Sequence, residues 1–334
     1  MSGFPPSPRP TTYKPALAVF AALGSAWVYL LVTLGALTTT INAGMVFPDW
    51  PLSNGSINPE GWLYDLAKFA EHSHRLSGVV MGLITLGITC WLWWREERHW
   101  LRQLGVWALV IVVLQGLIGG KRVILNEVDV PFFSMSLGEM LRIPHGILAQ
   151  VYVCVLIAVA AACSRYWIER ALPVGPAVRR AGIVCCALLL GQLAIAVTMR
   201  HNSAGLAIYT FPYSTPAPAN DWLPAVWDFR IAIHFAHRVM AVVLGVALGW
   251  YAWVIQRDRA ATFVLRSGAF VMLGLLALQV FLGAQIIWTL RRPEVTTGHV
   301  VVGALTLAVT FWLTWLAHRD RLEGAPPQPA AAPS

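Results

Sequence analysis

Four histidines lie within or at the edge of long apolar segments: His74, His145, His237 and His299. An ionisable side chain is costly in apolar surroundings, so its presence there favours a functional role. One such histidine alone is as often a hydrogen-bonded structural residue as a ligand. Four histidines at recurring positions favour a metal site, because imidazole is a good ligand for iron, copper and zinc.

The apolar segments that carry these histidines are long enough to cross a lipid bilayer. Of the 334 residues, 57% are hydrophobic and only 12% are charged. About 20 consecutive apolar residues span the bilayer core as a helix, and runs of this length are too uniform for barrel strands. The sequence therefore predicts an all-α integral membrane protein with eight transmembrane helices, at residues 16–40, 69–94, 103–120, 144–163, 181–199, 230–255, 264–289 and 297–317.

The distribution of Lys and Arg predicts how these helices are oriented, because these residues favour the cytoplasmic side. The termini and loops of one side carry fourteen of them and the other side carries eight, leaving aside Arg75 and Arg238 inside two segments. We expect both termini in the cytoplasm and the odd-numbered loops on the outer face of a cell inner membrane. The net charge of +8 reflects this asymmetry, so nucleic-acid binding is not expected.

The chain also repeats itself. EHSHRLSGVVMG at 71–82 matches HFAHRVMAVVLG at 234–245, and LQGLIGG at 114–120 matches LQVFLGA at 278–284. Four helices per repeat give both halves the same orientation, with the repeat axis along the membrane normal. The prediction is two tandem pseudo-symmetric four-helix bundles, 16–165 and 166–320, between disordered tails at 1–15 and 321–334.

In this arrangement the histidines of each half share one depth. His74 and His145 in the first half, and His237 and His299 in the second, fall within one or two turns of the outer ends of their helices, with His145 and His299 in a first turn. Haem iron takes two axial imidazoles, one on each side of the porphyrin, and facing helices of a bundle can supply them. The sequence thus predicts two haem sites near the outer face. A purified protein without a Soret band would contradict this.

Glu71 distinguishes the two halves. It lies three residues before His74 and therefore on the same helix face, whereas the equivalent residue of the second half is His234. Two halves that only carried electrons would have little reason to differ here. A carboxylate beside one haem can move protons or stabilise a cationic intermediate. The alternative is an interfacial glutamate exposed to the outer aqueous layer.

Arg75 and Arg238 each directly follow a proposed ligand. Guanidinium groups bind carboxylates bidentately, so both residues are candidate contacts for haem propionates. Snorkelling to lipid phosphates explains them equally well. His72 is expected to point elsewhere, and no role is assigned to His201.

These elements resemble the haem A synthase family. The resemblance rests on AGMVFPDWP after the first segment, E-x-x-H-R at 71–75, the His145 and His299 that open even-numbered segments, and H-R at 237–238. It covers residues 16–317. It implies an oxidoreductase that converts haem O to haem A, by oxidising a ring methyl to a formyl group, for terminal oxidase assembly.

The resemblance also implies a division of labour. His74 and His145 would face the iron of the substrate haem O, Glu71 would be catalytic, and His237 and His299 would ligate a resident haem b. A haem O synthase, an electron donor of unknown identity and a second copy of the chain are candidate partners besides the bilayer. Some relatives have a cysteine pair in the first outer loop, whereas the five cysteines here (Cys90, Cys154, Cys163, Cys185 and Cys186) all lie in or at the ends of apolar segments. A mechanism that needs that pair is therefore excluded for this chain.

Two other functions compete with this interpretation. A dihaem b-type cytochrome for electron transfer would explain the histidine pairs but not the difference between Glu71 and His234. A transporter would fit the parallel repeat, but it predicts broken helices and charges near the membrane midplane, whereas the ionisable residues here lie near the helix ends.

Overall fold

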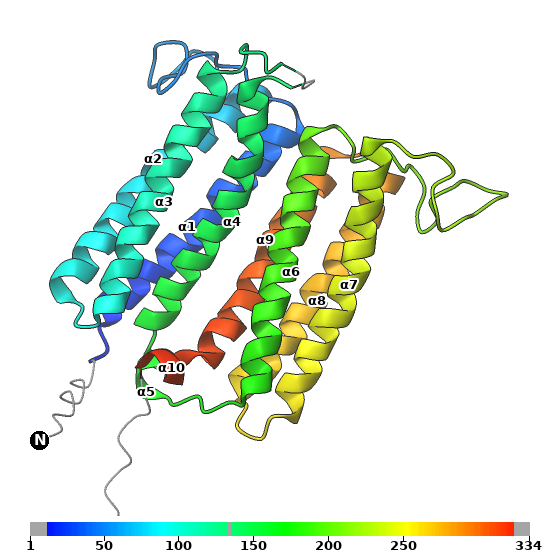
Figure 1. Cartoon of the computed structure of the whole chain (residues 1–334). Helices are drawn as coiled ribbons and strands as arrows, with labels where there is room; N and C mark the ends of the chain where they lie inside the picture. The colour runs from blue at the N-terminus through cyan, green and yellow to red at the C-terminus, as the bar shows by residue number, and fades with distance from the viewer. Residues whose placement is uncertain (1–11, 132–134, 324–334) are drawn as a thin grey trace, which may run out of the picture.

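The computed structural model describes residues 12–131 and 135–323, and within them the chain is helical with no strands. Eight helices are long and apolar enough to cross a membrane: α1 (Pro15–Thr40), α2 (Leu66–Arg95), α3 (His99–Ile124), α4 (Leu137–Cys163), α6 (Pro176–His201), α7 (Phe229–Arg257), α8 (Phe263–Trp288) and α9 (Pro293–Ala317). Two short helices, α5 (Arg165–Glu169) and α10 (Arg319–Glu323), lie at the end of the molecule where α1 begins (Figure 1). The predicted all-α membrane fold with eight spans is confirmed.

Local sequence signals explain where the helices begin. The Asp65 side chain accepts hydrogen bonds from the first amides of α2, and Asp228 does the same for α7. Ser136 and Glu139 form a reciprocal capping box at the start of α4. Such caps satisfy backbone donors that have no partner within the helix. Three further helices, α1, α6 and α9, begin at a proline, which suits a first helical position.

The capping box corrects one prediction. α4 begins at Leu137 and contains Pro144, so His145 is its ninth residue rather than part of its first turn. Hydropathy placed the start too late because Glu139 and Arg142 lower the apolar character of the first two turns. His299 is likewise the seventh residue of α9, outside the first turn. His74 and His237 are also ninth in their helices, so three of the four histidines lie at about 12 Å from the helix start at about 1.5 Å per residue.

Within each half the four long helices form a closed ring of contacts. α1 packs against α2 and α4, and α3 packs against both of them; α6, α7, α8 and α9 repeat this order. The two rings meet through α1, α4, α6 and α9, while α2, α3, α7 and α8 lie on the far sides (Figure 1). This packing is the one expected for two tandem four-helix bundles. The chain passes between them through α5, and the division at residue 165 stays a prediction.

The last described residues of the chain contact both halves of the molecule. Of the predicted tails, residues 1–11 and 324–334 lie outside the described part of the chain. Residues 321–323 are helical within α10, so the second predicted tail begins too early. The Glu323 side chain accepts hydrogen bonds from Arg98 of the first half and from the Trp167 indole, at 2.8 and 2.7 Å. This short helix therefore ties the two halves together at the end of the molecule away from the histidines.

The apolar core is concentrated at that same end. Its largest cluster includes Leu17, Leu101, Trp167, Tyr251 and Leu313, all at most 1% exposed. At the level of the histidines the packing changes: α6 has no buried residue after Leu189, and α7 has none between His234 and Leu244. Protein interiors are normally close-packed. Half-buried side chains inside a bundle are therefore consistent with a site built to surround a large group.

Candidate functional site

The two rings of the second predicted histidine pair lie close together between α7 and α9, tilted relative to each other. The ring centroids of His237 and His299 are 6.4 Å apart, with an interplanar angle of 59°. Two imidazoles that share one metal ion through bonds of about 2 Å have ring centroids about 6 Å apart. The Nδ1 atoms of both rings are buried without a hydrogen-bond partner. The pair therefore has the separation that two axial ligands of one iron require.

The first pair consists of His74 on α2 and His145 on α4. The two imidazoles are close enough for the charge of one to affect the other. Nδ1 of His74 is 3.2 Å from the Leu31 carbonyl. A carbonyl accepts only, so this contact places the proton on Nδ1 and leaves the Nε2 lone pair available to a metal. Nδ1 of His145 is buried without a hydrogen-bond partner. Among the described residues no three His, Cys, Asp or Glu side chains group into a metal site, so each site offers a pair of ligands, as haem needs.

Glycines on neighbouring helices make room for three of the four rings. A Cβ atom added at Gly35 would lie 2.8 Å from Cε1 of His74, at Gly119 3.1 Å from Cε1 of His145, and at Gly283 3.3 Å from Cε1 of His299. Gly119 and Gly283 occupy equivalent positions of the repeat. The two sites are thus built alike on α3 and α8.

Glutamines four residues earlier on the same two helices contact the same histidines. Nε2 of Gln115 donates to the His145 carbonyl at 3.0 Å, and Nε2 of Gln279 lies 3.2 Å from Nε2 of His299. Residue type alone indicates no role for these glutamines and glycines. The signal was present in the pattern L-Q-x-x-x-G, which both halves retain.

Glu71 is 3% exposed and holds loop one, the segment 41–65 between α1 and α2. Its Oε2 accepts hydrogen bonds from the Val46 and Phe47 amides at 2.8 and 3.1 Å, and its Oε1 accepts from Arg75 at 2.6 Å. In the second half His234 takes the equivalent place, and its Nδ1 accepts from the Ile208 amide at 3.2 Å. Both positions therefore anchor an outer loop, but only the first brings a carboxylate.

The two arginines beside the ligands are also bound to the loops. The terminal nitrogens of Arg75 donate to the carbonyls of Phe47, Asp49 and Leu52 and to Glu71. Those of Arg238 donate to the carbonyls of Ile208, Thr210 and Tyr213. The structure thus gives both residues a loop-binding role, and their contact with propionates stays a prediction.

Loop one is further ordered by its own side chains. Asp49 accepts hydrogen bonds from the Asn54 and Gly55 amides, both at 2.7 Å. Burial tends to raise the pKa of this carboxyl, but those amides and the Arg75 charge outweigh it and lower the pKa below its usual value. Nδ1 of His72 pairs with Ser53 Oγ at 3.0 Å, so this histidine also contacts the loop. The first site is thus covered by a loop with a defined shape.

The sequence matches the COX15-CtaA family of cytochrome oxidase assembly proteins over residues 18–311. It is 24% identical to a protein of Shouchella clausii over 318 residues, 91% of this chain and 97% of the relative. It is 28% identical to one of Rhodopseudomonas palustris over 348 residues, 90% of each, and 25% identical to one of Listeria welshimeri over 321 residues, 92% of this chain and 97% of the relative. Each of these relatives is named heme A synthase. With a match that spans all eight membrane helices, the chain belongs to the COX15-CtaA family of cytochrome oxidase assembly proteins.

Proposed function

We propose that this protein is a haem A synthase, an oxidoreductase that converts a methyl group of haem O to the formyl group of haem A. Family membership and the names of three relatives that align over at least 90% of their length support this function. Two histidine pairs on facing helices provide for two haem groups. The protein thereby contributes to terminal oxidase assembly.

The difference between Glu71 and His234 is the observation that carries the assignment of roles. We assign the substrate haem O to His74 and His145 and a resident haem b to His237 and His299. Glu71 lies one helical turn from His74 on the same face. Its counterpart beside the second pair has no carboxylate, which suits a site that does not transform its haem.

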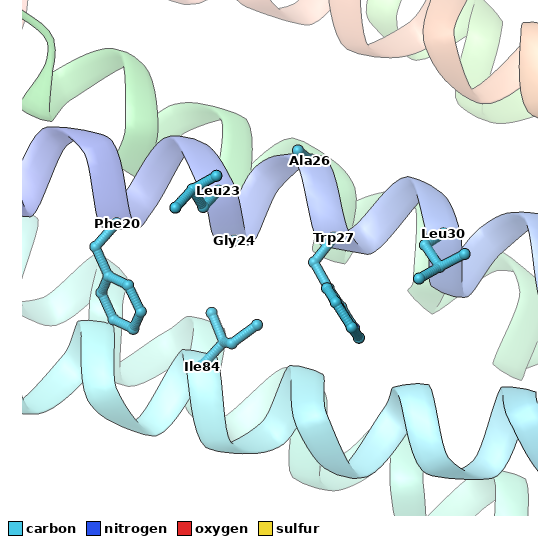
Figure 2. A pocket seen from close by; sticks show the side chains of 7 residues that line it. All are labelled: Phe20, Leu23, Gly24, Ala26, Trp27, Leu30 and Ile84. Carbon is cyan, nitrogen blue, oxygen red and sulfur yellow. The ribbon is translucent and has the colours of Figure 1, made fainter.

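An apolar groove in the first half supports this assignment. It lies between α1 and α2, and Figure 2 shows the Phe20, Trp27 and Ile84 side chains around the space next to Gly24. Its outer end is at Leu30, next to the Leu31 whose carbonyl contacts His74. Haem O carries a long isoprenoid chain that haem b lacks. The groove provides an apolar path for that chain, about 15 Å long over ten helical residues.

At the equivalent place in the second half, a cysteine on α6 contacts the backbone of α7. Cys185 and Ala247 stand at the repeat positions of Gly24 and Ile84, and Cys185 Sγ lies 3.4 Å from the Ala247 carbonyl oxygen. Cys185 is fully buried by this contact.

The chain's own residues position the substrate and manage protons. Conversion of a methyl to a formyl group removes four electrons from the carbon and adds one oxygen atom, which two successive hydroxylations and loss of water accomplish. The haem iron supplies the redox chemistry when bound. His74 and His145 fix the plane of the substrate, and loop one excludes water from its outer edge. Glu71, held by two amides and Arg75, is placed to take a proton released near His74.

The membrane orientation is part of the proposal. The excess of Lys and Arg at the end with α5 and α10 supports cytoplasmic termini and haem sites toward the outer face of the inner membrane. A haem O synthase that delivers the substrate, an electron donor, and an oxidant that supplies the oxygen atom and takes up the four electrons of the methyl carbon are the partners this reaction requires.

Pigment analysis tests the function. The full chain is expressed with and without a haem O synthase, purified, and its extracted haem is separated by chromatography and identified by mass. Haem A that forms only when haem O is supplied supports the synthase. Two unmodified haem b groups per chain in both preparations would support the dihaem cytochrome instead.

A further inference from the structure

Arg122 is a cation on the last turn of α3, next to the first histidine pair. It lies three residues after Gly119, the glycine that faces the His145 ring, and so on the same helix face one turn nearer the outer end. The guanidinium lies within electrostatic range of both His74 and His145. It is half-buried rather than directed into solvent.

Nothing among the described residues neutralises this charge. Arg122 donates one hydrogen bond, to the Gly44 carbonyl of loop one, and it takes part in none of the ion pairs. The nearby Glu71 carboxylate is bound to Arg75. Burial of an uncompensated charge is costly, and a partner of opposite sign relieves that cost. Arg122 therefore has donors and charge to offer to an anionic ligand.

The neighbours of Arg122 add to its positive field. Arg142 on α4 and His201 on α6 lie within its electrostatic range. Arg142 is engaged by Asn126 Oδ1 at 3.0 Å and by Glu139 at 3.6 Å. The terminal nitrogens of Arg75 and Arg238 donate hydrogen bonds to loop carbonyls. Arg122 is thus the arginine at the first site with the most unused hydrogen-bonding capacity.

We propose that Arg122 binds a propionate carboxylate of the substrate haem held between His74 and His145. This inference rests on the proposed function, which places that haem in the first half. A haem with its ring between the two imidazoles and its carboxylates toward the outer end would meet the guanidinium one turn beyond His145. Arg122 is then a positioning residue that fixes the rotation of the ring and, with it, which methyl group lies toward Glu71.

At the aligned sequence position the second half has no cation, although Arg291 of its outer loop approaches Gly205 as Arg122 approaches Gly44. The repeat that aligns Gly119 with Gly283 places Ile286 at the position of Arg122. This position of the repeat therefore carries a cation only at the proposed substrate site. A ring that must present one particular methyl needs a fixed rotation, whereas a haem that only carries electrons does not.

The test compares haem O with its dimethyl ester, which has the same ring and chain but no carboxylate charge. Binding is measured by absorbance titration of the full chain whose second site is already loaded. We expect the wild-type protein to bind the free acid about tenfold or more tightly than the ester, in line with a charge-assisted hydrogen bond. Arg122→Gln should reduce this ratio to near one, and Arg122→Lys should retain part of it.

Lys121→Gln is the matched control, because Lys121 is the adjacent residue and is exposed. It should keep the wild-type ratio. An unchanged spectrum of the haem at His237 and His299 shows that the Arg122 variants fold. An Arg122→Gln protein that still prefers the free acid by the wild-type factor would overturn the proposal. If the preference for the free acid depends on Arg122 but the protein forms no haem A, the proposed function is overturned. Arg122 would still be the contact for the haem carboxylate.

Discussion

At the scale of single residues, Glu71 has two tasks that one substitution can separate. Its carboxylate anchors loop one, and it is the proposed proton acceptor beside the substrate. Glu71→Gln keeps an acceptor oxygen for the Val46 and Phe47 amides but removes the charge. We expect haem A formation to fall at least about a hundredfold, the scale of a general acid–base contribution, with haem content retained.

The matched control is His234→Gln, which makes the same kind of change at the equivalent position of the second half. Extracted haem, quantified by mass, should show normal haem A production in that variant. Wild-type production by Glu71→Gln would limit Glu71 to the loop-anchoring role, as its contacts with Val46, Phe47 and Arg75 alone would suggest.

The loop contacts also show what residue types alone could not reveal. The sequence pairs Arg75 with Arg238 as residues that each follow a proposed ligand. It could not show that backbone carbonyls of Phe47, Ile208 and other loop residues take up their donors, because loop shape depends on tertiary contacts. For the same reason the sequence identifies Arg122 only as a cation near a loop. Its proximity to His145 depends on the packing of α3 against α4.

At the scale of elements, close approach of α3 to His145 depends on Gly119. A side chain here would press on a ligand ring 3.1 Å away, so we expect Gly119→Val to displace His145 and weaken haem binding at the first site. Gly116→Val on the same helix is the control, because an added Cβ there meets nothing within 4 Å. Absorbance spectra of the purified variants report the loss. Equal spectra from both variants would contradict the role of Gly119.

The groove between α1 and α2 gives a second prediction at this scale. Ile84→Trp should fill the space beside Gly24 and reduce the preference of the first site for haem O over haem b, because only haem O has the isoprenoid chain. Leu86→Trp serves as control, because Leu86 lies on the same helix and is 46% exposed. Competition between the two haems, read by mass after extraction, measures the preference. Unchanged competition would indicate that membrane lipid fills the groove.

The number of membrane helices and their grouping into two bundles could be predicted, because the lengths of the apolar segments and the internal repeat are visible in the sequence. The start of α4 could not be predicted from hydropathy, because Ser136 and Glu139 determine it through hydrogen bonds. Gln115 and Gln279 were missed for a related reason. Their role depends on the facing helix, and only three-dimensional packing brings α3 to α4 and α8 to α9.

At the scale of the whole molecule, the two halves are joined by charged groups at the end with α5 and α10. Glu96 pairs with Arg98 at 2.9 Å, and Arg98 reaches Glu323 at 2.8 Å. Burial tends to raise the pKa of Glu96, but the hydrogen bonds and charge of Arg98 outweigh it, so the pKa lies below its usual value of 4.5.

A lowered pKa in the folded state means that Glu96 stabilises the protein above about pH 4.5, and that this stabilisation is lost as the pH falls through the folded-state pKa. We expect thermal unfolding of the detergent-solubilised protein to show this acid-side loss, and Glu96→Gln to reduce it. Arg98→Ala should cost about 3–5 kcal/mol at neutral pH, because it leaves the buried Glu96 carboxylate with only Lys14, at 4.0 Å, as a partner of opposite charge. Identical acid-side slopes in wild type and Glu96→Gln would contradict the prediction.

The uneven packing along the membrane normal has a consequence for biogenesis. The end of the molecule with α5 and α10 has a closed apolar core, whereas at the level of the histidines the side chains of α6 and α7 are mostly half-buried and would be covered by a bound haem. We therefore expect haem insertion to be the last folding event. Hydrogen exchange in the outer turns of α6 and α7 should slow when haem binds, whereas the inner turns should be protected before and after binding. Uniform protection before loading would contradict this order. In a cell short of haem, the chains would be folded at the cytoplasmic end and accessible to quality-control proteases at the outer end. The supply of haem would then determine the amount of the protein.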